Sequence, residues 1–554
     1  MTSFQGWLQI AVFFAITTAC VPLLGGYMAK VFTGQRVWLS PVLAPVERAT
    51  YRVLRVDPGR SQSWKAYAGA LIVFSGLFWL VLYAILRTQA PWDLTFNTAS
   101  SFITNTNWQF YAGETTFSNL VQMAGLAVQN FVSAAVGLAV AVALIRAIAS
   151  RRGQDAGIGN FWVDLTRSLV YVLVPIALVV AVVLVSQGVV QTLSHATAFT
   201  GIAGQDGTIV TGPVASQEAI KMLGTNGGGF FNVNSAMPFE NPTGLSNWIE
   251  MWAMLVIPAS LTATYGRMVG SRRQGWAIFA AMGLLLVAST LVIYLAEAHG
   301  SPAQHLAGLA GGNMEGKEQR FGIANTSLFS ALTTAISCGA VNGALESLTG
   351  IGGLVPMVNM AYSESVFGGV GAGMYTMLLY VLLAVFVGGL MVGRTPEFLG
   401  KKIEAREIKL VSLALIFTPL IVLVFTAFAL ATTYGGPSIF NAGPQGFSET
   451  LYAYLSQANN NGSAFAGYTG LTFADLLGGL AMLLGRFVPI VLVLAIAGAL
   501  VKKRVAPPGL GTLRTDTPTF VGMNVFVVVL IGALTFFPAL LLGPVVQGLT
   551  DQLF

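Results

Sequence analysis

Four short turns in the sequence combine glycine or asparagine with small polar residues, and none of them carries an acidic side chain. Aligned on their centres, the turns share positions Asn107, Gly227, Gly339 and Gly462, at intervals of 120, 112 and 123 residues. Glycine at the centre of a turn permits backbone angles that direct successive carbonyl oxygens toward one axis. Rings of neutral carbonyls replace the hydration shell of a monovalent cation, whereas a divalent ion favours carboxylates. The four turns therefore predict a site for potassium, with sodium as the second choice.

The residues expected to line this site are the centre of each turn and the two residues before it. They are Asn105, Thr106, Asn107, Thr225, Asn226, Gly227, Ser337, Cys338, Gly339, Asn460, Asn461 and Gly462, with Gln109 beside them. Asn107 stands where the other three turns have glycine. A single turn of this kind is usually an ordinary surface turn. Four at a near-constant spacing favour an internal repeat instead.

A short amphipathic segment precedes each turn and must position it. Each segment contains residues typical of a helix start: Thr95 and Asn97, Ser216 with Glu218, Thr326 and Ser327, and Ser448 with Glu449. At about 1.5 Å per residue, so short a helix reaches only halfway through a bilayer. Its carbonyl end then lies near the membrane centre, where its partial negative charge favours a cation. The irregular turn that follows is tolerated at that depth only if it is buried in protein or lines a water-filled path.

The composition places these segments in a membrane, with lipid as the main solvent. Hydrophobic residues make up 55% of the 554 residues and charged residues 9%, whereas a soluble domain has roughly 25% charged residues. The net charge of +6 resides in short loops and forms no basic face, which argues against a nucleic-acid partner. Ten apolar stretches are long enough to cross a bilayer as helices. They are 7–30, 64–86, 120–147, 166–190, 246–270, 275–297, 371–393, 410–433, 474–501 and 520–547.

The distribution of lysine and arginine predicts the orientation of these spans. Of the 28 basic residues, 23 lie in alternate loops, and the positive-inside rule assigns those loops to the cytoplasm. Both termini and the four turns are then outside. The predicted fold is an all-α, multi-pass membrane protein with four pseudo-symmetric repeats of span, pore helix, filter and span around one pore. The expected divisions are 1–60 (extra span and loop), 61–150, 160–272, 273–396 and 405–504 (repeats), and 515–554 (extra span).

A single arginine, Arg486, lies near the middle of the apolar run 474–501. On insertion scales an arginine at mid-bilayer costs about 2.5–3.5 kcal/mol, and charges at that depth usually face a cavity or a partner. The favoured interpretation is a cationic plug or gate below the ion site. The alternative is a structural arginine that hydrogen-bonds free backbone carbonyls.

The stretch Gly350–Gly373 is too rich in glycine and polar residues for a continuous lipid-facing helix. We interpret it as a broken helix that lines a cavity, with Glu364 paired to a cation. Gly369 and Gly371 would then belong to a movable constriction below the ion site. The alternative is a flexible external linker.

Five strings in the chain are long and unusual: Thr104–Gln109, Gly224–Asn232, Ser337–Asn342, Gly393–Gly400 and Asn459–Phe465. They resemble the superfamily of potassium transporters with four channel-like repeats in one chain. Within it, the sequence is similar to the family of potassium-binding A subunits of the bacterial Kdp potassium-transporting ATPase. The resemblance covers essentially the whole chain, including the first and tenth spans.

This resemblance implies that the chain selects and admits potassium while a separate P-type ATPase subunit, B, hydrolyses ATP. It also implies two small membrane partners, the C subunit and the single-span F subunit, and a place in the bacterial cytoplasmic (inner) membrane. Potassium would be the transported ion, with no covalently bound cofactor.

The chain itself is expected to have no ATP site. It lacks the Asp-Lys-Thr-Gly-Thr phosphorylation string of P-type ATPases, and the glycine-rich run Gly311–Lys317 is followed by Glu318 where a phosphate loop needs serine or threonine. A stand-alone potassium channel or ion-coupled symporter is the alternative function. A non-transporting assembly scaffold is a third hypothesis, but a scaffold has no need of four polar turns at membrane depth.

Overall fold

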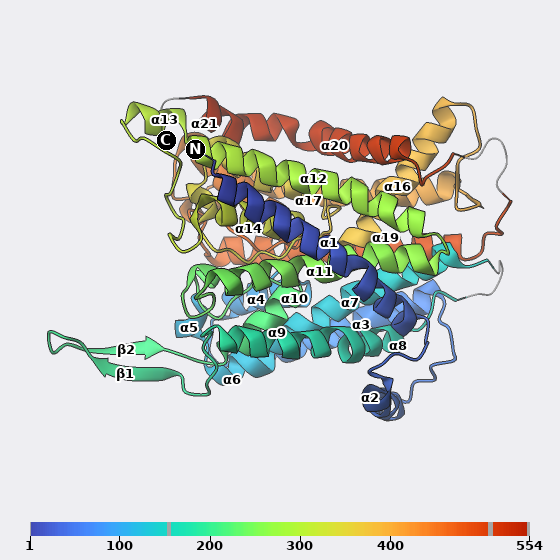
Figure 1. Ribbon diagram of the computed structural model, residues 1–554, viewed down its shortest axis with the longest axis horizontal. Helices are drawn as coiled ribbons and strands as arrows, with labels where there is room; N and C mark the ends of the chain where they lie inside the picture. The colour runs from blue at the N-terminus through green and yellow to red at the C-terminus, as the bar shows by residue number, and fades with distance from the viewer. Residues whose placement is uncertain (1, 152–156, 508–512, 551–554) are drawn as a thin grey trace.

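The computed structural model describes residues 2–151, 157–507 and 513–550. Long helices run between the two ends of a bundle (Figure 1). Within the described ranges, nine helical segments are long and apolar enough to cross a membrane. They are Phe4–Phe32 (α1), Trp64–Leu86 (α3), Asn119–Ala149 (α6 to α7), Phe161–Ser186 (α8 to α9), Arg272–Leu306 (α12 and α13), Ala372–Met391 (α16), Ala405–Ala431 (α17), Thr472–Leu500 (α19) and Pro518–Leu549 (α20 to α21). The predicted all-α, multi-pass membrane fold is confirmed.

Three of these segments contain a π-helical turn, and a fourth combines a long helix with a short one. Their parts are α6 (Asn119–Val121), η1 (Gln122–Ala127), α7 (Val128–Ala149), α8 (Phe161–Arg167), η2 (Ser168–Leu173), α9 (Val174–Ser186), α12 (Arg272–His299), α13 (Pro302–Leu306), α20 (Pro518–Leu540), η6 (Leu541–Val545) and α21 (Val546–Leu549). The remaining short elements are α5 (Gly113–Thr116), η3 (Asn234–Ala236), η4 (Leu345–Ser347), η5 (Gly436–Ser438), β3 (Glu397–Phe398) and β4 (Lys401–Lys402).

One expected span, 246–270, has no counterpart among these nine segments. It corresponds to helix α11 (Gly244–Met268). With 25 residues it is long enough to cross a bilayer, but it is not among the nine segments apolar enough to do so. Its buried residues include Asn247, Glu250 and Thr264, and it packs between α1 and α12. A helix that other helices enclose needs no lipid-compatible surface. Length and composition therefore support nine spans in the described chain and leave the expected number of ten as a prediction.

Four shorter helices precede the four turns: α4 (Trp92–Ile103), α10 (Val214–Leu223), α14 (Gly322–Ala335) and α18 (Gly443–Ala458). The expected helix starts were wrong, because each helix begins two to five residues earlier, at a residue whose N-cap makes no side-chain hydrogen bond. The polar residues read as caps lie inside the helices, where some of them bond to neighbouring elements. For example, Asn97 Nδ2 donates to the carbonyl oxygen of Asp475 at 2.9 Å. The hydroxyls of Thr326 and Ser327, by contrast, have no hydrogen-bond partner in the described part of the chain.

The two ends of the bundle differ in what they carry. Helix α1 begins and α21 ends at the same end, where the antiparallel hairpin of β1 (Ala196–Thr200) and β2 (Asp206–Val210) projects (Figure 1). Helix α2 (Ser40–Leu54) lies at the opposite end. The described part of the chain therefore begins and ends on one side of the bundle, away from the arginine-rich segment around α2.

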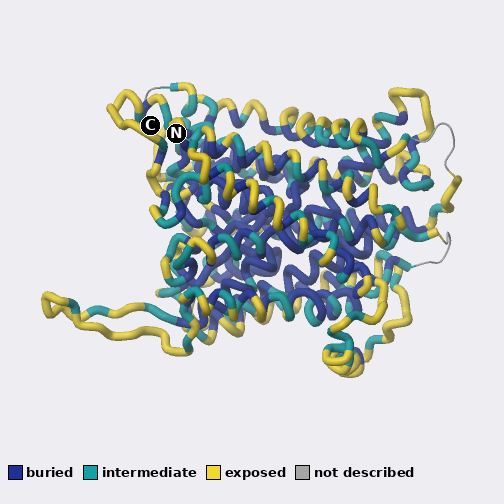
Figure 2. Tube along the Cα trace, viewed as in Figure 1, coloured by how far each residue is buried: buried dark blue, intermediate teal, exposed yellow. Residues whose placement is uncertain are grey.

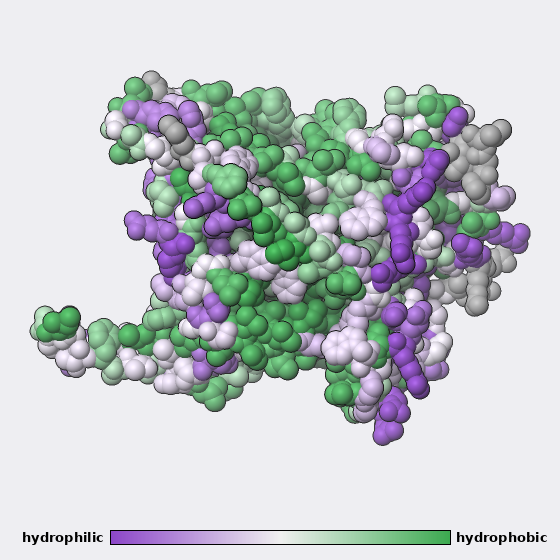
Figure 3. Space-filling view, in the orientation of Figure 1, coloured by the Kyte–Doolittle hydropathy of each residue, from purple (hydrophilic) through white to green (hydrophobic). Residues whose placement is uncertain are grey.

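Burial and hydropathy follow the pattern expected of a protein in lipid. Buried residues concentrate along the middle of the bundle, and exposed ones lie on the outer helices and the end loops (Figure 2). On the visible face, hydrophobic side chains cover the middle and hydrophilic ones gather toward the ends (Figure 3). Exposed Leu and Val side chains at mid-helix are stable only against an apolar solvent.

Candidate ion site

The four turns share one backbone conformation. In each, the first and third residues of the expected triplet have positive φ. The values are 67° and 54° at Asn105 and Asn107, 47° and 88° at Thr225 and Gly227, 53° and 88° at Ser337 and Gly339, and 52° and 97° at Asn460 and Gly462. Positive φ is uncommon for residues other than glycine and costs of order 1–3 kcal/mol when the fold imposes it. Because positive φ recurs at the first and third residues of all four turns, the four turns must meet the same structural requirement.

The turns contact one another in cyclic order. A Cβ atom added to any of three central glycines would overlap a backbone carbonyl oxygen of the next turn. The pairs are Gly227 with Cys338, Gly339 with Asn461, and Gly462 with Thr106. The second turn therefore adjoins the third, the third adjoins the fourth, and the fourth adjoins the first. Glycine is needed at these positions for close approach as well as for positive φ.

Side chains close the ring between the first turn and the second. Asn105 Nδ2 donates to the carbonyl oxygen of Thr225 at 2.9 Å, and Asn226 Nδ2 donates to Asn105 Oδ1 at 2.6 Å. Gln109, expected beside the site, exchanges two hydrogen bonds with the backbone of Gly229, at 3.1 and 3.2 Å. All four turns thus belong to one closed ring.

Asn107 is accommodated by the residue opposite it. A Cβ added to Gly228 would lie 2.8 Å from the Cβ of Asn107, so glycine at 228 leaves room for the side chain at 107. The Asn107 amide then donates to Asn130 Oδ1 at 2.6 Å, which ties the first turn to α7. Asparagine at position 107, where the other turns have glycine, is therefore compensated by glycine at position 228, where the first and second turns meet.

The central residues of all four turns line one cavity of about 650 Å³. The same cavity is lined by Gln109 and by two acidic residues, Glu318 and Glu346. Glu318 is paired with Arg320 at 3.5 Å, and Lys317, which also lines the cavity, is paired with Glu297. Glu346 therefore contributes negative charge to the lining, which lowers the potential there and favours cations.

The middle residue of each turn presents a carbonyl oxygen with no donor. Among the described residues, no hydrogen bond is donated to the carbonyls of Thr106, Asn226, Cys338 and Asn461. The other carbonyls of the turns also lack a donor in the described chain, except those of Thr225 and Gly227 in the second turn, which accept side-chain amides. The middle carbonyl is therefore the one without a donor in all four turns. Buried carbonyls without donors are unfavourable unless another partner takes their place. A desolvated monovalent cation is a suitable partner.

A buried charge cluster, which the sequence reasoning missed, supports the second turn. Lys221 Nζ in α10 lies 2.6 Å from Glu218 Oε2, 3.0 Å from Glu240 Oε2 and 2.8 Å from Asn234 Oδ1. Lysine and both glutamates are buried. The Glu218–Lys221 spacing of three residues within a short helix was the available signal.

The expected break in Gly350–Gly373 is present. Helix α15 (Gly350–Ala361) ends ten residues before α16 begins, and the segment between them has positive φ at Ser363, Glu364, Phe367, Gly369 and Gly371. This segment touches the turns directly. The amide of Val370 donates to Thr225 Oγ1 at 2.8 Å, and the amide of Gly369 donates to the carbonyl of Ile336.

Arg486 is paired, as expected for a charge at this depth. Its Nη1 lies 3.5 Å from Glu364 Oε2, and both side chains are buried. Arg486 and Glu364 line a small cavity of about 30 Å³ together with Asn460 of the fourth turn. Arg486 Nη2 and Glu364 Oε1 have no hydrogen-bond partner. The structure therefore brings the two residues together directly beneath the ring of turns.

Lys317, the last residue of the phosphate-loop-like run, is not available to a nucleotide. Its Nζ lies 2.8 Å from Glu297 Oε2, and both side chains are fully buried.

Comparison with known proteins gives a concordant result. Residues 11–549 match the family described as "Potassium-transporting ATPase A subunit". The chain belongs to this family. Curated members include the "Potassium-transporting ATPase potassium-binding subunit" of Methylorubrum extorquens, 56% identical over 99% of both chains. The protein of the same name from Rhizobium rhizogenes is 54% identical over 99% of both chains.

Among solved structures, this chain resembles the potassium transporter TrkH from Vibrio parahaemolyticus. The TM-score is 0.54 over 89% of this chain and 98% of that chain, with 14% sequence identity. At this identity the likeness concerns the fold alone.

Proposed function

We propose that this A subunit binds and selects potassium from the outside and passes it into an ATP-driven uptake pump. The observation that carries the proposal is the closed ring of four turns with matching backbone angles and four carbonyl oxygens that lack donors. Neutral oxygens converging from four directions suit a desolvated monovalent ion. The names of the curated relatives support potassium as that ion. The family description, an ATPase subunit, gives no support to a stand-alone channel or symporter.

The roles proposed for single residues follow from their positions. The carbonyls of Thr106, Asn226, Cys338 and Asn461 are the first candidates for ion ligands, and the remaining residues of the turns, with Gln109, hold them in place. Arg486 and Glu364 form a charged constriction beneath the ring, and Gly369 and Gly371 allow the segment around them to move. The contacts of Val370 to Thr225 and of Gly369 to Ile336 would link the position of this segment to the shape of the turns.

The surroundings of the subunit are also part of the proposal. The four turns would belong to four repeats, 61–150, 160–272, 273–396 and 405–504, with extra spans at 1–60 and 515–554. The subunit would lie in the bacterial inner membrane with both termini outside. ATP hydrolysis would take place on a P-type ATPase subunit, B, with the C subunit and the single-span F subunit completing the complex.

A binding measurement tests the central claim. Radioactive rubidium, a potassium analogue, is titrated onto the purified assembly with and without Gly227→Ala, which places a Cβ against Cys338. The matched control is Gly76→Ala in α3, because a Cβ there meets nothing within 4 Å. We expect loss of binding in the first variant and no change in the second. Unchanged binding in a folded Gly227→Ala protein would contradict the proposal.

A further inference from the structure

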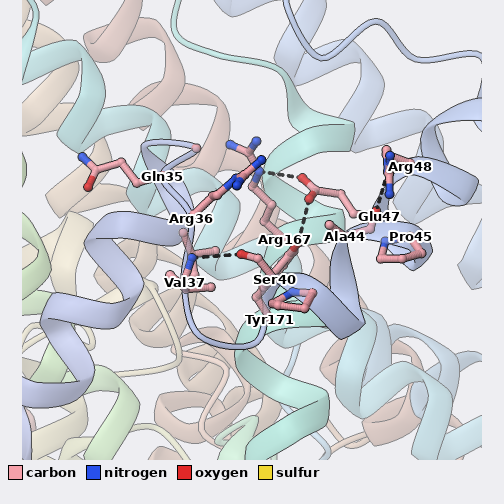
Figure 4. Close-up of a pocket in the computed structure, with 13 residues that line it drawn as sticks. Gln35, Arg36, Val37, Ser40, Ala44, Pro45, Glu47, Arg48, Arg167 and Tyr171 are labelled. Atoms are coloured by element: carbon pink, nitrogen blue, oxygen red, sulfur yellow. Dashed lines mark hydrogen bonds and ion pairs between the residues drawn. The ribbon is translucent and has the colours of Figure 1, made fainter.

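A second cavity lies at the end of the bundle opposite the hairpin, far from the ring of turns. It has a volume of about 620 Å³ and is enclosed by the end of α1, the connection 33–39, helix α2 and the segment α8–η2. Figure 4 shows its lining, in which polar side chains from α2 meet others from the membrane-spanning bundle. None of its lining residues belongs to the four turns or lines the cavity of the ion site.

Glu47 fastens α2 to the bundle inside this cavity. Its Oε1 lies 2.9 Å from Arg167 Nε and accepts a hydrogen bond from the Tyr51 hydroxyl at 2.7 Å. Its Oε2 accepts one from the Tyr171 hydroxyl at 2.8 Å. Burial opposes ionisation of Glu47, but these donors together hold its pKa below the ordinary value. The single carboxylate in the lining is therefore fully occupied by its own partners.

Two further arginines line the cavity without a counter-ion. In the described chain neither Arg36 nor Arg48 forms an ion pair, and the one side-chain hydrogen bond of Arg48 goes to the carbonyl of Ala44 in its own helix. Arg36 extends toward the Glu47 and Arg167 side of the cavity (Figure 4). With Arg167, the lining carries three guanidinium groups against one carboxylate. This excess of positive charge fits an anion, and guanidinium groups bind phosphate oxygens through paired hydrogen bonds.

The outer face of α2 is apolar and exposed. Val42, Val46 and Val53 are 71%, 50% and 80% exposed, and at 100° per residue they lie on one face of the helix. Trp38, just before the helix, is 78% exposed. A helix with basic residues beside an exposed apolar face is typical of one that lies in the membrane interface.

We propose that this cavity binds the phosphate of an anionic phospholipid, with Arg36, Arg48 and Arg167 as its ligands and the apolar face of α2 among the neighbouring acyl chains. A lipid is favoured over a protein segment because one short helix contributes to the positive lining on its inner side and carries the exposed apolar face on its outer side, in a chain that spans a membrane. It is favoured over free phosphate for the same reason. Such a site would fasten the interfacial helix to the leaflet on the side of the basic loops.

The test compares two charge-matched double variants of the full-length chain in the assembly in which it is purified. R36Q/R48Q removes two arginines of the cavity lining. R52Q/R55Q removes two arginines of the same segment that do not line it. Bound phosphatidylglycerol is measured by native mass spectrometry after reconstitution in mixtures with phosphatidylcholine. The loss of two specific guanidinium–phosphate contacts predicts binding about 100-fold or more weaker in R36Q/R48Q, well beyond the effect of general surface attraction.

The proposal requires that R52Q/R55Q retain most of the phosphatidylglycerol that the wild type binds. Equal losses in the two variants would mean general surface attraction only and would overturn it. Displacement of the lipid by millimolar inorganic phosphate would identify a free-phosphate site and would also overturn it. Phenylglyoxal modifies accessible arginines. If a partner chain protects Arg36 from this reagent even without anionic lipid, the cavity is a subunit interface, and the proposal is overturned.

Discussion

The side-chain amide of Asn234 donates a hydrogen bond to the carbonyl oxygen of Gly227, with 2.6 Å between nitrogen and oxygen. Lys221 Nζ donates in turn to Asn234 Oδ1. Both side chains are buried. A lysine behind the ring of turns thereby fixes the direction of the carbonyl of Gly227, a central residue of the ring.

Loss of the Asn234 amide should weaken potassium binding. A typical buried hydrogen bond contributes about 1 kcal/mol, so Asn234→Ala should lower the affinity about 5-fold. Competition of potassium against radioactive rubidium measures the effect. Gln205→Ala, at an exposed position in the turn between β1 and β2, is the control and should bind as the wild type does. Equal affinities in the two variants would show that the Gly227 carbonyl needs no support.

Loss of the Lys221 charge should damage folding more than binding. Lys221→Met leaves Glu218 and Glu240 buried without their cation, and removal of one partner from such a pair typically costs about 3–5 kcal/mol. We expect a lower thermal transition and a poor yield, measured by tryptophan fluorescence of the purified protein. Lys409→Met removes an exposed lysine and should leave the transition unchanged. Lys221→Arg should recover part of the loss.

The Asn107–Gly228 contact should behave as a coupled pair. Gly228→Ala places a Cβ 2.8 Å from that of Asn107 and should destabilise the ring, whereas N107G/G228A removes the collision. The double variant then resembles the interface in which Gly227 adjoins Ala340. A double-mutant cycle on rubidium affinity should give a coupling of about 1 kcal/mol or more. Strict additivity would show that the two positions do not compensate each other.

Arg486 and Glu364 should control ion passage more than folding. Arg486→Gln leaves Glu364 without its cation beneath the ring, so the constriction changes charge from neutral to negative. We expect altered selectivity or an uncoupled potassium leak in proteoliposomes. E364Q/R486Q, which is neutral again, should restore the barrier in part. Normal assembly with normal uptake in Arg486→Gln would remove the gate hypothesis.

Acidification should release helix α2. The pKa of Glu47 is lowered in the folded protein, so its contribution to stability is present above its ordinary pKa, about 4.5, and is lost as the pH falls through the folded value. A spin label at Val53 should become more mobile below that pH. Glu47→Gln should abolish the pH dependence, and a mobility change that persists in this variant would assign it to another group.

Several features follow from local sequence. The apolar stretches predicted nine segments that the structure bears out, because transfer of a helix into lipid depends on its own composition. The four turns were found because glycine and asparagine adopt positive φ more readily than other residues, although Thr225 and Ser337 adopt it here as well. The span at 246–270 showed where this reasoning stops, since α11 is enclosed by neighbours and its hydropathy says little about its depth.

The sequence by itself determined that this protein is helical, that it spans a membrane and that it contains four similar turns. Only the tertiary structure decided that the turns adjoin in the order of the chain and close through Asn105 and Gln109. It also decided that Arg486 meets Glu364 and that Lys221 reaches Gly227 through Asn234. The reason is physical: backbone conformation and transfer to lipid depend on residues close in the chain. Contacts between residues far apart in the chain depend on how whole helices pack.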